Sequence, residues 1–257
     1  MDEFKCSNCA TCCKNIRGFL TEKQKKELRK YSFGALPMVS LIPVERIAFP
    51  LWDFEAKKLI KDATEKGIEH KIRPSRAIFD LDSNQAIIVS YSIDSDFCTF
   101  MKGNQCQSYE KRGFVCKMFP FQHGPFLKLE EFAINEMFAG CPSMANILDN
   151  LEKFDKKKLT MQLKEKFGDS FLSVLQSDLI TQWINNMILT LVKEKKIRPA
   201  MNYPYDLLLK RIDNSKKIDF MDFLVEIKEM TKEDKDNLIH CFETNHHAKE
   251  KVKDDLS

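Results

Sequence analysis

The fold class is decided by the stretch Arg76-Ala-Ile-Phe-Asp-Leu-Asp-Ser-Asn-Gln-Ala-Ile-Ile-Val-Ser-Tyr-Ser-Ile93. Its two halves, 76–81 and 85–93, are rich in Ile, Val, Phe and Tyr, which are residue types typical of β-strands. The segment between them, Asp82-Ser-Asn84, has the turn-forming residues that join two antiparallel strands. The sequence therefore predicts a β-hairpin, and this hairpin leads directly to Cys98.

Two helices are predicted before this hairpin in the sequence. Residues 21–30 predict a short helix with Thr21 as its N-cap, and residues 53–66 predict a second helix. Gly67 is placed to end the second helix, since glycine adopts the left-handed conformation that often follows a helix.

The chain after residue 150 is predicted to be helical. Apolar residues recur every four positions from Phe167 to Leu191, which is the spacing of a helix that buries one face. Residues 219–230 predict a further helix, and Thr231 begins a capping pattern for another. We expect the charged tail, residues 249–257, to be frayed.

Composition excludes several classes of protein. The chain has 257 residues, of which 43% are hydrophobic and 31% charged, a balance that excludes a disordered chain. Its net charge is only +3, so we expect no nucleic-acid partner. The longest uncharged runs have 14 residues, fewer than the roughly 20 that cross a bilayer, so we expect no membrane span. The first residues, MDEFKC, show no secretory signal, and we therefore expect a cytoplasmic protein with reduced cysteines.

Eight of the nine cysteines fall within residues 1–141, and Cys241 stands apart from them. Four of the eight lie in one short segment and four follow a long gap: Cys6, Cys9, Cys12 and Cys13, then Cys98, Cys106, Cys116 and Cys141. If the short segment is helical, three of its thiols share a face and Cys12 points away. If it is a turn, its C-x2-C-x2-C spacing resembles that of [4Fe–4S] ferredoxins, whose remote fourth cysteine precedes a proline, as Cys141 does here. Zinc accepts the same thiolates, so both metals stay open.

These segments closely resemble the CxxCxxCC cysteine-cluster family, often called YkgJ-like and described as a zinc- or iron-chelating domain. The matching residues are Phe4-Lys-Cys-Ser-Asn-Cys-Ala-Thr-Cys-Cys13, Cys98-Thr-Phe-Met-Lys-Gly-Asn-Gln-Cys106, Tyr109-Glu-Lys-Arg112-Gly-Phe-Val-Cys116-Lys-Met-Phe-Pro-Phe121 and Cys141. All eight cysteines of the family can be assigned, and the resemblance implies that they ligate metal. Gly113 departs from the family pattern, which usually has proline after the arginine. A related cluster occurs in flagellin lysine methylases, so the resemblance also extends to enzymes.

Basic residues adjoin the cysteines. Four thiolates around Zn²⁺ or around a cubane core leave negative charge at a site, and buried charge must be compensated. Lys5, Lys14, Lys117 and Arg112 are close in sequence to the predicted ligands. We expect Arg112 to support the bound cofactor, since its planar guanidinium can donate to several sulfurs or carbonyls.

The sequence thus predicts an α+β chain. A cysteine-rich metal-binding domain with a small β-hairpin covers 1–149, and a helical C-terminal region packed on it covers 150–257. The predicted function is binding of a [4Fe–4S] cluster or Zn²⁺ through the eight cysteines. One division of the thiols places three of the first four with Cys141 and the remaining one with Cys98, Cys106 and Cys116; a single site with spare thiols is the other.

Two further functions stay open. The cluster could serve a protein-modifying or redox enzyme, which would need a pocket beside the cysteines. Alternatively, metal could fold the domain while the helices from Phe167 to Leu191 bind a protein partner, which would require an exposed apolar face. The eight glycines are too widely spaced for a GxGxxG or Walker loop, so we expect no nucleotide fold of those types.

Overall fold

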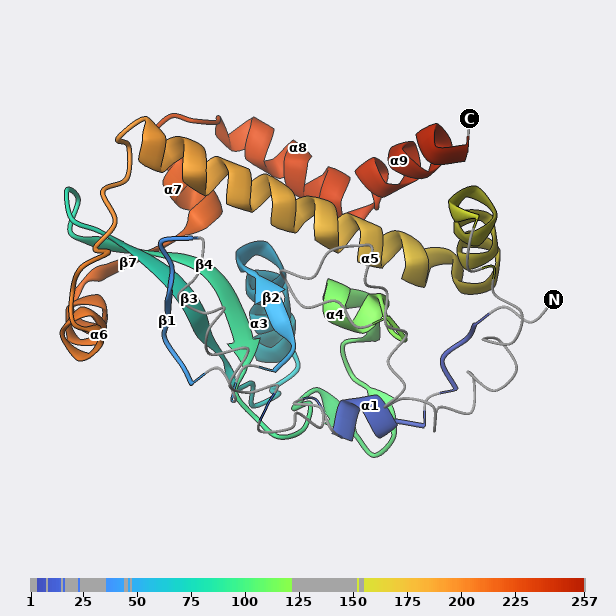
Figure 1. The fold of residues 1–257 in the computed structure, drawn as a ribbon. Coiled ribbons are helices and arrows are strands. Elements are labelled where there is room, and N and C mark those ends of the chain that lie inside the picture. Colours follow the sequence, from blue (N-terminus) through green and yellow to red (C-terminus); the bar gives the residue numbers. More distant parts are fainter. Residues whose placement is uncertain are drawn as a thin grey trace.

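The structure, a computed structural model, describes residues 4–7, 9–14, 16, 23, 36–43, 46, 48–121, 152 and 155–256. The described chain is a mixed α/β fold with an antiparallel sheet and a helical C-terminal region, as predicted (Figure 1). Apart from residue 23, the helix expected over 21–30 lies outside the described residues, and so does Cys141, a predicted ligand.

The predicted hairpin forms the centre of the sheet. Strands β3 (Ile72–Asp80) and β4 (Gln85–Ile93) pair in antiparallel register, so the prediction is confirmed and the first strand begins earlier than expected. The turn is closed by Asp80, whose carboxylate accepts hydrogen bonds from the backbone N–H and hydroxyl of Ser83 at 2.9 and 2.6 Å. Asn84 takes the left-handed conformation, with φ at 55°, that asparagine tolerates better than most residues.

Three short strands complete the sheet. Strand β1 (Val39–Ser40) pairs with β3, and β2 (Pro50–Trp52) pairs with one end of β4. The other end of β4 pairs in parallel with β7 (Lys216–Asp219), which the sequence analysis did not predict. The chain after residue 150 is therefore not only helical, because it contributes one strand to the sheet of the N-terminal half.

Helix α3 (Asp53–Glu65) follows β2 and confirms the helix predicted over 53–66. Lys66 is its C-cap, and Gly67 follows with φ at 63°, the left-handed conformation expected of it. The N-terminal cap is unusual because Trp52 precedes the helix. The Glu55 carboxylate reaches back to the Trp52 backbone N–H at 2.9 Å, and this satisfies one of the donors that a helix start leaves free.

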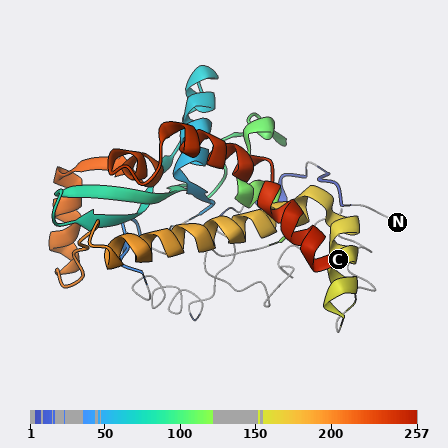
Figure 2. The same ribbon diagram turned by 90° about the horizontal axis from the view of Figure 1, so that it is seen from above.

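Helix α5 (Lys156–Lys193) runs the length of the molecule, with non-helical dihedrals at Gly168 (Figures 1 and 2). The predicted apolar stripe is confirmed as core. Toward the N-terminus, Phe167 and Phe171 pack with Phe121, and toward the C-terminus Ile180 and Ile188 pack with the sheet and α7. The exposed apolar face that a partner-binding role for this stripe requires is thus largely covered by the chain itself.

Four helices follow α5 in the chain: α6 (Tyr205–Asn214), α7 (Phe220–Glu226), α8 (Lys232–Glu243) and α9 (His246–Leu256). Helix α7 is shorter than the helix predicted over 219–230. Helix α8 begins as predicted, with the Thr231 hydroxyl accepting from the Asp234 backbone N–H at 3.1 Å. The prediction of a frayed tail is wrong: α9 buries Ala248 and Val252 in the core that surrounds Phe167.

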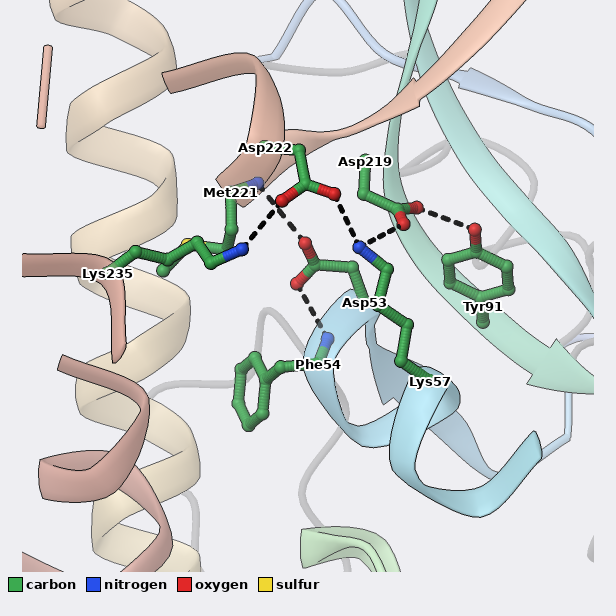
Figure 3. Close-up of polar contacts among 8 residues, drawn as sticks. All are labelled: Asp53, Phe54, Lys57, Tyr91, Asp219, Met221, Asp222 and Lys235. Atoms are coloured by element: carbon green, nitrogen blue, oxygen red, sulfur yellow. Dashed lines mark hydrogen bonds and ion pairs between the residues drawn. The ribbon is translucent and has the colours of Figure 1, made fainter. Parts of the chain in front are cut away.

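A polar network fastens the C-terminal helices to the sheet and to α3 (Figure 3). The Lys57 Nζ lies 2.6 Å from a carboxylate oxygen of both Asp219 and Asp222. The Asp219 carboxylate also accepts a hydrogen bond from the Tyr91 hydroxyl on β4, at 2.6 Å. These contacts join β7 and the α7 helix that follows it to α3 and β4, which lie far earlier in the sequence, and they fix the position of α7.

Asp53 completes the network in Figure 3. Its side chain is buried, and its two oxygens accept from the backbone N–H groups of Phe54 and Met221 at 2.9 and 3.1 Å. Burial raises the pKa of Asp53 to about 6.

Among the described residues, no helix is both long and apolar enough to cross a membrane, and this includes the 38-residue α5.

Candidate metal centre: the cysteine cluster

The first cysteines lie in a turn that leads into one helical turn, α1 (Thr11–Lys14). Ala10 reverses the chain with φ at 61°, so Cys6 and Cys9 precede the helix and the fully helical arrangement of this segment is wrong. Cys12 and Cys13 are neighbours on α1, and their Sγ atoms are 3.9 Å apart. Cys6 is exposed, whereas the other three thiols are partly buried. The Thr11 side chain lowers the pKa of Cys9 by hydrogen bonding to its sulfur.

The next two cysteines lie at a compact two-stranded ribbon, residues 101–106, that follows the sheet. Cys98 comes just before this ribbon, and Cys106 is on its second strand. Strands β5 (Met101–Lys102) and β6 (Gln105–Cys106) pair so that Met101 faces Cys106. Gly103 turns the chain between them with φ at 62°, a conformation that favours glycine. The ribbon therefore returns Cys106 toward the segment that contains Cys98.

Two hydrogen bonds join α1 to this ribbon. The backbone N–H of Cys98 donates to the carbonyl of Cys13 at 2.8 Å. The Lys14 Nζ donates to the Asn104 side-chain oxygen at 3.2 Å. The fold thus brings together two cysteine segments that 84 residues separate in the sequence.

Cys116 lies on the short helix α4 (Phe114–Lys117), and the Cys98, Cys106 and Cys12 thiols act on its pKa. Gly113 precedes this helix with φ at −71°, a value that other residues also adopt. Glycine is therefore not needed here for a left-handed conformation. A Cβ at this position would lie 2.8 Å from the Leu51 side chain and 3.0 Å from Glu55 Oε1. Glycine is therefore required for close packing, because the Glu55 carboxylate accepts from the Phe114 backbone N–H at 2.6 Å.

The thiols influence one another electrostatically. Burial raises the pKa of Cys98 to about 11, and the neighbouring Cys106 and Cys12 add to this shift. Burial also raises the pKa of Cys116 well above its usual value, with further contributions from Cys98, Cys106 and Cys12. For Cys12, the hydrogen bond with Cys13 is the main cause of a raised pKa. Thiols from three segments are therefore close enough to oppose one another's ionisation.

Arg112 lies beside this cluster. Its Nε donates to the Tyr109 carbonyl at 3.0 Å, and its guanidinium carbon stacks 3.6 Å from the centre of the Tyr109 ring. Its positive charge acts against the raised pKa of Cys116. Arg112 is thus held rigidly at the edge of the cluster, where its charge favours the Cys116 thiolate.

The donor set suits a soft metal. Sulfur ligands select zinc, Cu(I) or iron–sulfur clusters, and Cys98 lies in a dry cluster with Phe100, Leu51 and Ile93. The buried hydroxyl oxygen of Thr99 has no hydrogen-bond partner within the described part of the chain. A thiolate or sulfide drawn in beside Cys98 would be a natural acceptor for it. In the described segments, however, no three Cys, His, Asp or Glu side chains lie close enough together to hold a metal ion.

Sequence reasoning identified these cysteines but missed three surrounding groups. The Asn104 contact and the Thr99 hydroxyl have no sequence signature. Glu55 has part of one, because it stands three residues after the N-cap as in a capping box, but Trp52 occupies the usual Ser or Thr position. Cys241 lies on α8, above α5 in Figure 1, whereas α1 and α4 lie below α5.

Comparisons of the chain with family models, with curated proteins and with solved structures find no match.

Proposed function

We propose that this chain is a metal-binding protein whose cysteine cluster holds a [4Fe–4S] cluster or Zn²⁺. One observation carries the proposal. The Cys98–Cys13 hydrogen bond and the ribbon that bears Cys106 bring Cys13, Cys98 and Cys106 to one part of the fold. An apolar core could have been built without thiols at these positions. We also propose that the protein lies in the reducing cytoplasm, where such thiols stay free. We further propose that the chain belongs to the cysteine-cluster family.

A metal would remove the electrostatic conflict of the cluster. Several ionised thiols in one dry place repel one another, and a bound cation replaces that repulsion by attraction. Binding would draw the sulfurs together and release protons. The free energy of binding would then also stabilise the fold around α1 and α4.

The arrangement favours one division of the thiols. Cys12, Cys98 and Cys106 all help to raise the pKa of Cys116, so we propose these four thiols as one four-sulfur site, which the Cys12–Cys13 contact joins to the other N-terminal cysteines. A second site would use Cys6, Cys9 and Cys13, with Cys141 as its fourth ligand. Iron is our preferred metal, because three N-terminal thiols and a remote Cys-Pro follow the ferredoxin pattern. Arg112 would offset part of the negative charge of the first site.

The test is anaerobic purification followed by elemental analysis and an absorption spectrum. We expect near-stoichiometric iron, with a band near roughly 400 nm that bleaches on reduction, or a colourless protein with zinc. Cys116→Ser should reduce the metal content, whereas the matched variant Cys241→Ser should leave it unchanged. A folded protein that takes up neither metal would overturn the proposal, as would equal metal loss from the two variants.

A cluster-dependent enzyme is the second candidate. One observation favours it: a pocket adjoins α4, the helix that carries Cys116. Turnover would require this pocket to receive a substrate or cosubstrate.

A further inference from the structure

A pocket lies between the sheet and α5, beside α4. Its apolar wall includes Trp52 from β2, Phe114 from α4 and Ile184 from α5. Its polar groups include Arg76 from β3, Ser90 from β4 and Asn185 from α5. Apolar walls with a few convergent polar groups are the usual composition of a small-molecule site.

An irregular strand pairing shapes the pocket wall. Arg76 faces Ser90, but Pro74 faces Tyr91 and Ala77 faces Ile88, so each strand has one extra residue beside this pair. Consecutive residues of a regular strand point to opposite faces of a sheet. Here, Val89 and Ser90 both line the pocket. Such bulges re-aim side chains and are common next to functional sites.

Arg76 brings positive charge into this apolar setting. Burial lowers its pKa to about 10, which reflects the loss of water around the guanidinium. A guanidinium has five N–H donors in a planar fork, so it can hold a carboxylate in addition to the interactions it already makes. Across the pocket, the Asn185 amide makes no hydrogen bond to any described residue and is available to a ligand.

Glu55 also lines the pocket, but its carboxyl group is hydrogen-bonded to the backbone. Its two carboxylate oxygens accept from the N–H groups of Trp52 and Phe114. Burial raises the pKa of Glu55 to about 7, so below that pH its carboxyl group is mostly neutral and Arg76 supplies the charge of the lining. A lining with one positive charge suits a ligand with one negative charge better than a phosphate.

We propose that this pocket binds a small monocarboxylate with an apolar body, with Arg76 holding the carboxylate and Trp52, Phe114 and Ile184 enclosing the body. The ligand site is separate from the cysteines and does not depend on the metal. It shares α4 with them, since Phe114 and Val115 line the pocket on the helix that bears Cys116.

The test uses 4-methylpentanoate as the probe and titration calorimetry on the full chain. A control ligand, 3-methylbutylamine, has a similar branched body with the opposite charge. We expect saturable binding of the carboxylate and none of the amine. Arg76→Met should weaken carboxylate binding at least about tenfold, equivalent to about 1.4 kcal/mol. Arg73→Met is the matched control, because Arg73 is exposed on the same strand, and it should bind as the unchanged protein does.

A second pair of variants covers the case in which Arg76→Met does not fold. Asn185 and Asn186 are adjacent on α5, and only Asn185 lines the pocket. Asn185→Leu should weaken binding severalfold, whereas Asn186→Leu should leave it unchanged. Absence of saturable carboxylate binding, equal binding of the amine, or equal effects of the two asparagine variants would overturn the proposal.

Discussion

Helix α5 and its partners bury many large apolar side chains, whereas the short elements around the cysteines bury only a few, such as Phe100 and Phe114. Phe167, Ile180, Ile188 and Leu191 are each at most 2% exposed. In the cysteine region, α1 and α4 have four residues each, β5 and β6 have two each, and no side chain of α1 is buried. A small region with little apolar burial needs another source of stability, and metal ligation is a common one. We therefore expect the two regions to be ordered by different forces.

The largest effect should come from the apolar region. Phe167→Ala removes a ring that packs against Phe121 and the α9 side chains, and it should lower the free energy of unfolding by about 3–5 kcal/mol. Chemical denaturation measures this change. Metal content per folded molecule should stay the same, because Phe167 supplies no ligand. If metal were lost in proportion to stability, the two regions would not be ordered separately.

The second effect concerns pH. Burial raises the pKa of Glu55 to about 7 and that of Asp53 to about 6, above the values they take in the unfolded chain. The folded state therefore binds more protons between about pH 4 and pH 7, and its stability should rise as pH falls from 7.5 to 6, by about 1–2 kcal/mol. Denaturation at these two pH values measures the difference.

Two substitutions assign this pH dependence to its groups. Glu55→Gln removes the group with the higher pKa and should reduce the rise more than Asp53→Asn does. Glu226→Gln is an exposed control that should leave the rise intact, because hydrogen bonds from Gln85 and Lys216 lower the pKa of Glu226. Stability that falls between pH 7.5 and 6 in the unchanged protein would contradict the assignment.

The smallest effect should come from a helix cap in the apolar region. Thr231→Ala removes the hydroxyl that accepts from the Asp234 N–H, and it should cost about 1 kcal/mol. Thr231→Ser keeps the hydroxyl and should cost much less. Thermal unfolding of the two variants gives the comparison, and equal losses would show that the cap hydroxyl does not contribute.

Local patterns explain what the sequence predicted. The β3–β4 hairpin, α3, the α5 stripe and the Thr231 cap all depend on residues that are close in the chain. Strand β7 was missed because its pairing with β4 is non-local and only four residues long. Helix α9 was missed because only Ala248 and Val252 are buried among its charged residues.

The candidate metal centre was predictable in its residue types but not in its arrangement. Spacing indicated that the cysteines act together, yet which thiols meet depends on the Cys98–Cys13 hydrogen bond and on the ribbon that returns Cys106. Likewise, the reason for Gly113 became clear only from the close approach of Leu51 and Glu55. Tertiary contacts of this kind leave no periodic signal in a single sequence.

Hydrogen exchange with and without metal tests the central claim most directly. The amide of Cys98 donates to Cys13 and reports on the cysteine region, whereas the amides of residues 180–191 report on α5. In protein loaded with metal, we expect both sets to be protected. After chelation, protection of Cys98 and of the 113–118 amides should fall by orders of magnitude while that of α5 remains. Equal protection of the cysteine region in the loaded and chelated protein would contradict the account.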